Sequence, residues 1–312
     1  MGGDIGPEVA IKGAWLALRE RKNVSFLFHG RDAVLVPLLE KYPELKPHSR
    51  VIHAENVVAM DEKPSQALRK HRGNSSMWAA IQSVKDGEAD VAISGGNTGA
   101  LMAMATFCLR PMEGISRPGI AAIWPTLRAD CIVLDVGATI GGDAKQLVDF
   151  SILGAALARA LFDQELPSIG LLNVGTEEMK GHDEVREAAA ILTSASGAGF
   201  RYHGFVEGDD LGKGTVDVVV TDGFTGNVVL KTLEGGMKFF AGKVFEALTS
   251  SPEAKEAAKV LLPALMPLAE ALDPSTYGGA LLLGTDGVCI ISHGSSNATS
   301  ILNASKVARD MV

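Results

Sequence analysis

The chain has few cysteines and few aromatic residues. Of its 312 residues only 3 are cysteines, Cys108, Cys131 and Cys289, and 5% are aromatic. The cysteines lie far apart inside apolar stretches, and no two of them have the spacing of metal ligands. An odd, scattered set is typical of a reduced, cytoplasmic protein, and it argues against a disulfide scaffold or a zinc module.

The sequence also lacks an excess of positive charge, a signal peptide and a long apolar segment. It has 29 Lys and Arg against 37 Asp and Glu, a formal net charge of −8. A nucleic-acid partner is not expected, because it needs a net basic surface. An acidic protein partner would need a local basic patch. No basic start is followed by an apolar run, and no apolar segment is long enough to span a bilayer.

Glycine and aliphatic residues, by contrast, are abundant, and the aliphatic residues gather in short runs. The runs most typical of strands are 24–28, 90–94, 131–136, 168–174, 216–221 and 287–292. They are nearly continuous, as in strands buried on both faces, so a mostly parallel sheet is expected. Helical patterns such as 145–162 and 180–193 lie between them, and no linker divides the chain. We therefore expect one α/β domain over 1–312, with room for two lobes.

Three of these runs end in similar turns. "DVAISGGNTGA" (90–100) and "DVVVTDGFTGN" (217–227) align without a gap, and "GVCIISHGSSNATS" (287–300) repeats their outline. A strand, a Gly-rich turn and a helix form a ready site for phosphate, although such residues also simply make tight turns and helix caps. We expect the three turns to meet at the carboxyl edge of one parallel sheet, where ligands bind.

The opening "MGGDIGP" (1–7) is similar to a loop of metal-dependent isocitrate and isopropylmalate dehydrogenases. Such enzymes need carboxylates around a metal and a cluster of arginines on the substrate. The arginines between 69 and 117 form no regular cluster, and Asp135 and Asp143 lack a second acidic pair at helical spacing. No G-x-G-x-x-G follows a strand. The likeness is therefore one of loop geometry more than of chemistry.

Ordered motifs cover nearly the whole chain. They are "MGGDIGP" (1–7), "SGGNTGALMA" (94–103), "GISRPGIAA" (114–122), "DVGA" (135–138), "GLLNVGTEEMKG" (170–181), "FVEGDDL" (205–211), "DVVVTDGFTGNVVLKTLEG" (217–235) and "YGGALLLGTDGVCIISHGSSNA" (277–298). Together they resemble the bacterial phosphate acyltransferase family, PlsX, or acyl-ACP:phosphate transacylase. Two departures stand out: members usually have a short strand ahead of the first motif, and Thr139 and Ile140 replace an Asn and a Cys.

The resemblance implies a fold and a reaction. The fold is a three-layer α/β/α sandwich related to phosphotransacetylases and to isocitrate and isopropylmalate dehydrogenases. The reaction moves a long acyl chain from acyl carrier protein to inorganic phosphate, without metal or cofactor, and gives acyl phosphate for phospholipid synthesis. The alternatives are a short-chain phosphotransacylase using coenzyme A, a metal-dependent decarboxylating dehydrogenase, and a non-enzymatic acyl-carrier-binding protein.

Positioning and oxyanion stabilisation should dominate this reaction, because phosphate is already a nucleophile. Our catalytic candidates are Lys180, Asn227 and His293; their alternative roles are a surface lysine, a helix cap and a structural histidine. The candidates for binding phosphate or the acyl carbonyl are Gly3, Asp4, Gly96, Asn97, Thr98, Gly99, Asp135, Gly223, Thr225, Gly226, Ser295, Ser296 and Asn297. The buried cysteines are poor nucleophile candidates.

Residues 251–276 are expected to form a helical projection, since the family has one at its dimer interface with an apolar tip on the membrane. Val260 to Leu272 is almost wholly apolar and is broken by Pro263 and Pro267, a pattern that also fits a kinked core helix. The expected partners are acyl carrier protein, phosphate, a second copy and a membrane glycerol-3-phosphate acyltransferase. "RKHR" (69–72) is the densest basic candidate for docking. The expected location is the cytoplasm, with peripheral contact to the inner face of the membrane.

Overall fold

The structure is a computed structural model that describes residues 1–195, 197, 199–271, 274–277 and 279–312. The strands are β1 Phe26–Gly30, β2 Ser49–His53, β3 Val91–Ser94, β4 Gly119–Trp124, β5 Cys131–Leu134, β6 Ser168–Leu172, β7 Arg201–Val206, β8 Val218–Val220, β9 Ala280–Leu283 and β10 Val288–Ile291. The helices are α1 Pro7–Glu20, α2 Asp32–Glu40, α3 Pro64–His71, α4 Ser76–Lys85, α5 Thr98–Leu109, α6 Ala144–Phe162, α7 Asp183–Ser194, α8 Asp210–Lys213, α9 Gly223–Leu248, α10 Pro252–Ala271 and α11 Ala298–Asp310.

An 8-stranded sheet in the order β3-β10-β9-β4-β5-β8-β6-β7 forms the middle of the fold, and β1 and β2 form a separate 2-stranded parallel sheet. Each of the six expected strand ranges overlaps a strand, and the two expected helices are α6 and α7. The prediction of a mostly parallel sheet is confirmed, since β3–β10, β5–β8, β8–β6 and β6–β7 pair in parallel.

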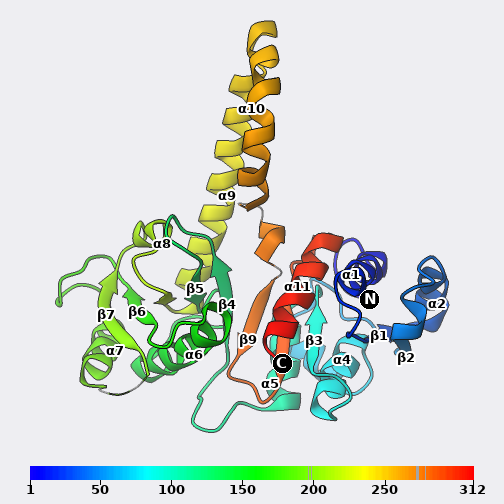
Figure 1. The fold of residues 1–312 in the computed structure, drawn as a ribbon. Helices are drawn as coiled ribbons and strands as arrows, with labels where there is room; N and C mark the ends of the chain where they lie inside the picture. Colours follow the sequence, from blue (N-terminus) through cyan, green and yellow to red (C-terminus); the bar gives the residue numbers. More distant parts are fainter. Residues whose placement is uncertain (196, 198, 272–273, 278) are drawn as a thin grey trace.

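The side chains of the sheet alternate between two buried layers. On β5, Cys131 and Val133 face one layer with α4 and α5, whereas Ile132 and Leu134 face the other with α6, α7 and α11. Both layers are apolar, which explains why the strands read as continuous hydrophobic runs. Figure 1 shows these helices on either side of the sheet. The three-layer α/β/α sandwich is therefore confirmed.

Strand direction reverses in the middle of the sheet. Strand β9 is antiparallel to β10 and to β4, and β4 is antiparallel to β5. These three antiparallel pairs make β5, β8, β6 and β7 run opposite to β3 and β10. Their carboxyl ends therefore lie at opposite edges of the sheet, which we call the first edge (after β3 and β10) and the second edge (after β5, β8, β6 and β7).

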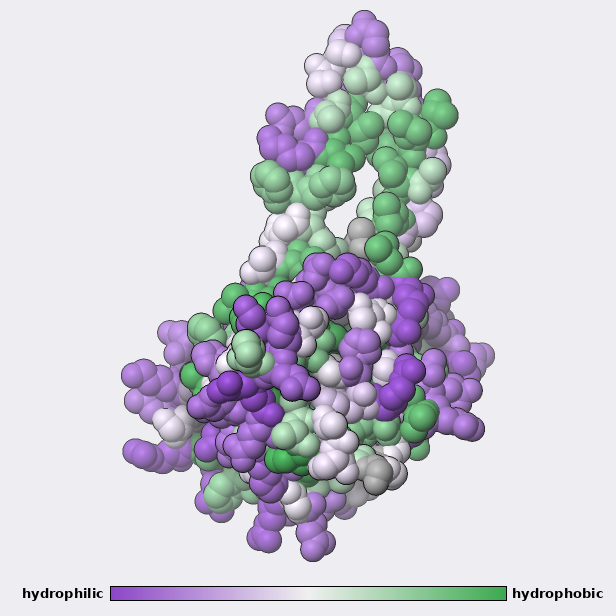
Figure 2. Space-filling model, turned by 90° about the vertical axis from the view of Figure 1, so that its left-hand side faces the viewer, coloured by the Kyte–Doolittle hydropathy of each residue, from purple (hydrophilic) through white to green (hydrophobic). Residues whose placement is uncertain are grey.

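Helices α9 and α10 form a long antiparallel arm that projects from the body (Figure 1). Its large apolar side chains are exposed, among them Phe240 at 69% and Val260 at 80%. The expected helical projection is thus present and is not core. The expected apolar tip is wrong, because the turn at the far end is polar, Thr249–Ser251, and the apolar residues lie along the shaft; Figure 2 shows both. Leu272, the end of the apolar segment, lies outside the described residues.

None of the helices in the described part of the chain is both long enough and apolar enough to cross a membrane.

Candidate active site

Three loops pack backbone against backbone at the first edge: 1–6 before α1, 94–98 after β3 and 293–297 after β10. The N–H of Asp4 donates to the carbonyl of Gly294 over 2.8 Å. A Cβ added to Gly3 would lie 3.1 Å from the Gly95 oxygen and 3.2 Å from the Gly294 oxygen. Gly3 also has a φ of +89°, so both space and conformation require glycine there.

The N-termini of α1, α5 and α11 follow directly from these loops. Asn97 caps α5 by accepting from the Ala100 N–H at 2.9 Å, and Asn297 caps α11 by accepting from the Ser300 N–H at 2.9 Å. Both caps are neutral amides, so no capping carboxylate cancels the positive ends of the α5 and α11 dipoles. An anion at these loops would be favoured by several helix ends together.

Asn97 builds the loop itself and is not free to bind substrate. Its side-chain nitrogen donates to the carbonyls of Ala59, Met60 and Glu62 at 3.2, 2.9 and 2.8 Å, while its oxygen caps α5. All the hydrogen-bonding groups of this buried amide are therefore engaged. Thr98, the next candidate, is exposed. Gly99 packs on Pro64, which leaves no room for a Cβ at that position.

His293 is exposed at the end of β10 and is held by its own loop. Its Nδ1 lies 2.7 Å from the Ser295 hydroxyl and accepts from the Ser295 N–H at 3.2 Å. The hydroxyls of Ser292 and Ser296 are 2.7 Å apart. A Cβ on Gly294 would lie 3.0 Å from an Asp4 carboxylate oxygen, so this carboxylate stands beside the same loop.

Asp135, at the second edge, is completely buried and holds the turn after β5. Its carboxylate accepts from the N–H groups of Ile120, Gly137, Ala138 and Thr139 and from the Thr139 hydroxyl, at 2.9–3.1 Å. Burial raises the pKa of this carboxyl, and these hydrogen bonds oppose the rise. Its role is to shape the turn, because both oxygens are occupied.

Asp222, which we did not predict, caps α9. It accepts from the N–H groups of Phe224 and Thr225 at 3.0 and 3.1 Å and from the Thr225 hydroxyl at 2.6 Å. A fixed carboxylate therefore already occupies the positive end of this helix, which disfavours phosphate there. Asn227, expected to open or cap this helix, lies four residues after its first residue, Gly223, and is exposed beside Gly137.

Two glycines allow the turn before α9 to pack closely against the turn that Asp135 holds. A Cβ at Gly223 would meet the Asp135 carboxylate and the Thr139 backbone, and a Cβ at Gly226 would overlap the Asp135 carbonyl. The Gly223 N–H donates to the Thr139 hydroxyl at 3.1 Å. Gly223 and Gly226 thus serve close packing of two turns. Thr139, where the resembled family has Asn, fits this arrangement.

Lys180 lies in the exposed loop after β6, also at the second edge. The Asn173 side chain donates to the Lys180 carbonyl at 3.0 Å, and the Lys180 N–H donates to the Glu177 carbonyl at 3.0 Å, so the loop is closed. Gly181 has a φ of +87° and packs on Asn173. Among the described residues the Lys180 ammonium has no ion-pair partner.

The candidates therefore form two groups instead of one site. At the first edge lie Gly3, Asp4, Gly96, Asn97, Thr98, Gly99, His293, Ser295, Ser296 and Asn297. At the second edge lie Asp135, Lys180, Gly223, Thr225, Gly226 and Asn227. The expectation that all three Gly-rich turns meet at one edge is wrong, because β9 and β4 reverse the strand direction. Four strand steps of about 4.8 Å also separate β10 from β8, roughly 19 Å.

The three cysteines are buried in the core. Burial raises the pKa of the Cys131 and Cys289 thiols to about 12 and also raises that of Cys108. Neutral, inaccessible thiols are poor nucleophiles. No acyl-enzyme on cysteine is expected from this geometry.

The basic cluster 69–72 is smaller than its sequence suggests. His71 is buried and bonds to Glu62 at 3.0 Å, and the Arg72 guanidinium lies 4.0 Å from the ring centre of Phe107. Lys70 is within 3.8 Å of the Glu62 carboxylate. Arg69 is exposed. Arg69, Lys70 and Arg72 are all exposed and therefore provide the accessible positive charge of this segment.

Known proteins of solved structure share this fold. A phosphotransacetylase from Streptococcus pyogenes superposes with a TM-score of 0.64 at 18% identity, covering 97% of this chain and 91% of the other. A 4-hydroxythreonine-4-phosphate dehydrogenase from Klebsiella pneumoniae gives 0.58 at 14% identity, covering 99% and 98%. At these identities the likeness shows the fold alone.

Sequence relatives are much closer. Phosphate acyltransferases from Brucella ovis and from Brucella melitensis biotype 2 are each 52% identical to this chain over all its 312 residues, which is 90% of their own length. The sequence model of the fatty acid synthesis protein family matches residues 1–312. The chain therefore belongs to this family, that of the bacterial phosphate acyltransferases.

Proposed function

We propose that this acyltransferase moves a long acyl chain from the thioester of acyl carrier protein to inorganic phosphate at the first edge. The convergence of three helix N-termini on loops 1–6, 94–98 and 293–297 supports this assignment, together with the neutral caps Asn97 and Asn297. The second edge is less suited to phosphate, because Asp143 and Asp222 cap α6 and α9 with carboxylates.

In the proposed reaction a phosphate oxygen attacks the carbonyl carbon of the thioester. The carbon–oxygen bond forms, the carbon–sulfur bond breaks, and the thiolate of the carrier leaves with a proton from solvent. Negative charge grows on the carbonyl oxygen before the sulfur leaves, so a fixed donor aimed at it lowers the barrier. His293 is our candidate for that donor, because its Nδ1 is held by Ser295 and its Nε2 remains available.

Lys180 and Asn227 remain proposed stabilisers of the transition state. Within one chain, however, they lie at the second edge, and the sheet separates them from the first edge. We propose that the protein is a homodimer in which the second edge of one copy faces the first edge of the other. A site shared in this way would contain His293 from one copy and Lys180 from its partner.

We further propose that acyl carrier protein docks near the exposed basic residues Arg69, Lys70 and Arg72, and that the apolar arm of α9 and α10 contacts lipid. The exposed aromatic and aliphatic side chains of the arm support contact by burial. A lipid-soluble product such as a long-chain acyl phosphate makes this placement useful.

The test is hydroxylamine trapping of the product, because hydroxylamine converts acyl phosphate to a hydroxamate. We expect hydroxamate from palmitoyl-acyl carrier protein with phosphate, and none without phosphate. Parallel reactions with acetyl-coenzyme A and palmitoyl-coenzyme A distinguish the short-chain alternative, which would give hydroxamate fastest with acetyl-coenzyme A. Absence of hydroxamate in every reaction of folded protein would refute the proposed function.

A further inference from the structure

Large apolar side chains are exposed in the loops of the second edge. Ile140 after β5 is 93% exposed, Met179 after β6 is 79% exposed, and Phe224 after β8 is 62% exposed. Val174, in the same loop as Met179, is 77% exposed. We call these four residues the apolar cluster. Single exposed apolar residues are ordinary on a protein surface, but a group of them in adjacent loops indicates a site that binds a ligand or a partner.

The three loops that carry the apolar cluster are neighbours. Strands β5, β8 and β6 lie side by side and in parallel, so their carboxyl ends follow one another along the second edge. Ile140 and Phe224 each come directly after a residue of a close contact, because the Gly223 N–H donates to the Thr139 hydroxyl at 3.1 Å. Two strand steps of about 4.8 Å separate β5 from β6, so the apolar cluster covers roughly 10 Å of the edge.

A cation and an amide lie in the same loops. Lys180 follows Met179 directly, and its ammonium forms no ion pair within the described part of the chain. Asn227 is exposed three residues after Phe224 in α9, a spacing that puts both on one side of the helix. The second edge is therefore complementary to a molecule with a long apolar chain and an anionic or carbonyl head. The acyl thioester and the acyl phosphate of the proposed reaction are molecules of this kind.

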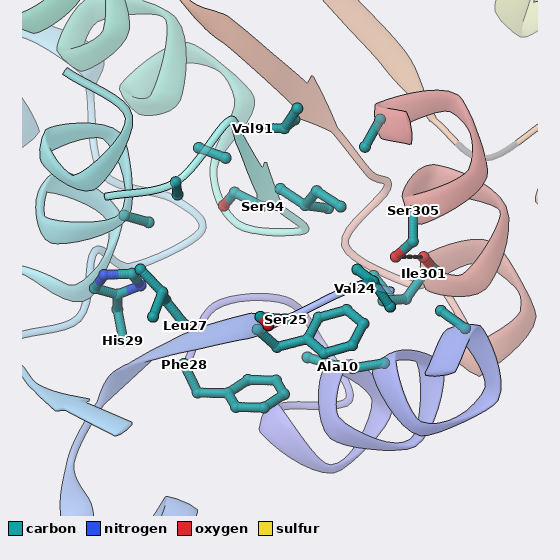
Figure 3. A pocket seen from close by; sticks show the side chains of 18 of the residues that line it. Ala10, Val24, Ser25, Leu27, Phe28, His29, Val91, Ser94, Ile301 and Ser305 are labelled. Atoms are coloured by element: carbon teal, nitrogen blue, oxygen red, sulfur yellow. Dashed lines mark hydrogen bonds between the residues drawn. The ribbon is translucent and has the colours of Figure 1, made fainter. Parts of the chain in front are cut away.

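A cavity of about 740 Å³ between β1 and β3 is another space large enough for an acyl chain. Figure 3 shows Leu27 of β1 and Val91 of β3 on opposite sides of it. Among the described residues that line this cavity, none is a candidate catalytic residue, whether Lys180, Asn227 or His293. The apolar cluster, by contrast, shares its loops and helix α9 with two of these candidates.

We propose that the apolar cluster holds the long acyl chain of the substrate, with the thioester or phosphate head beside Lys180. This inference rests on the proposed function, because it assigns the acyl-binding surface of that reaction. In the proposed homodimer, an acyl chain at the second edge of one copy lies opposite the phosphate at the first edge of the other. The chain covers exposed side chains such as Ile140 and Met179, and each methylene that it buries there tightens binding by about fourfold at most.

The test measures the binding of alkyl phosphates, which have the head and chain of an acyl phosphate but no reactive carbonyl. Octyl, decyl and dodecyl phosphate, each below its critical micelle concentration, are titrated into the folded protein by calorimetry. We expect the Kd of the wild type to fall by about twofold to fourfold per added methylene. Ile140→Ser with Met179→Ser should raise the Kd for dodecyl phosphate by about tenfold or more and that for octyl phosphate by less. The Tm of this double variant should change little, because both side chains are exposed.

Two further variants separate the chain from the head and from general surface effects. Lys180→Ala should raise the Kd of all three alkyl phosphates by the same factor and keep their dependence on chain length. Leu166→Ser is the matched control, because it removes a 59% exposed apolar side chain from the loop before β6, at the opposite end of that strand. It should leave every Kd unchanged.

An unchanged dependence on chain length in Ile140→Ser with Met179→Ser would overturn the proposal. Loss of the dimer in sedimentation, with that dependence intact, would overturn it as well, since the apolar cluster would then be a contact between copies. Failure of the proposed function gives a different result: folded protein forms no hydroxamate, while alkyl phosphates still bind at the apolar cluster. Hydroxamate formation together with unaltered binding in the double variant would keep the function and reject the cluster as the acyl site.

Discussion

The backbone N–H of Ser295 donates to Nδ1 of His293 over 3.2 Å. A nitrogen that accepts carries no proton, so the neutral ring has its proton on Nε2, and this nitrogen can donate to a ligand. The Ser295 hydroxyl, 2.7 Å from the same Nδ1, helps to hold the ring. The histidine at the end of β10 is therefore oriented before any substrate binds.

Replacing His293 should damage catalysis and spare folding. Losing one oxyanion donor typically costs about 10²–10³ in kcat, so His293→Ala should lower kcat by roughly that factor. The ring is exposed, so the Tm should change little. Ser295→Ala, which loosens the ring but keeps the N–H bond, should cost less. Near-normal kcat in His293→Ala would remove this residue from the mechanism.

A mixing experiment tests whether Lys180 and His293 act in one shared site. Lys180→Ala and His293→Ala should each be poorly active alone. If one copy supplies each residue, half of the randomly mixed dimers have one intact site of two, and activity should return to about one quarter of the wild-type value. A mixture no more active than its components would exclude the shared site. Lys12→Ala, a lysine of α1 remote from the second edge, serves as the control.

The core cysteines should be dispensable for chemistry. Cys131 is 2% exposed and Cys289 is 0% exposed, and burial raises the pKa of both thiols to about 12. Cys131→Ala and Cys289→Ala should therefore keep kcat within about threefold while losing about 1 kcal/mol of stability. Iodoacetamide should not label the native protein at pH 8. An acyl group trapped on either sulfur would contradict direct attack by phosphate.

The arm should carry lipid binding without contributing to the stability of the fold. Phe240→Glu with Val260→Glu places charges on two exposed apolar positions, so flotation with phosphatidylcholine liposomes should fall while the Tm and the turnover of soluble substrate stay nearly constant. Ser250→Glu, at the polar end of the arm, is the matched control and should leave flotation unchanged. Undiminished flotation of the double variant would place lipid contact elsewhere.

His29 should make stability fall at acid pH. Burial lowers the pKa of its ring from 6.5 to about 4, with the ring 2.9 Å from the Ser83 hydroxyl. A lowered pKa in the folded state means that the neutral ring is favoured, so its contribution is complete above pH 6.5 and is lost as the pH falls toward 4. His29→Gln should flatten the Tm profile between these values. The control is His182→Gln, which replaces an exposed histidine and should not flatten the Tm profile. Parallel Tm profiles for wild type and His29→Gln would contradict the assignment.

Local patterns predicted most elements, but not how the sheet is assembled. Apolar runs such as 131–136 and 168–174 indicate β5 and β6 because both faces of these strands are buried. Strands β4 and β9, which we did not predict, reverse the sheet and separate the repeated turns. Strand direction is set by pairing between residues far apart, such as Gly119 with Leu283, and no local pattern contains it.

The candidate site was predictable where chain geometry is local. The caps Asn97 and Asn297 follow from an Asn or Asp placed just before a helix, and Asp222 could have been found by the same signal. The hydrogen bonds that Asn97 donates to three carbonyls of residues 59–62 could not be predicted, because those residues come near Asn97 only in the folded chain.

Strand β3 pairs with β10 in the register Val91 with Val288, and α1 packs against α11. Helix α1 and strand β3, both in the amino-terminal half, therefore lack these partners until the last part of the chain has been made. During synthesis on a ribosome, where chain emerges at about 5–20 residues per second, β3 stays without its partner strand β10 for some 200 residues of elongation, roughly 10–40 s. A nascent chain with such an exposed edge is a natural client for chaperones that bind extended apolar segments.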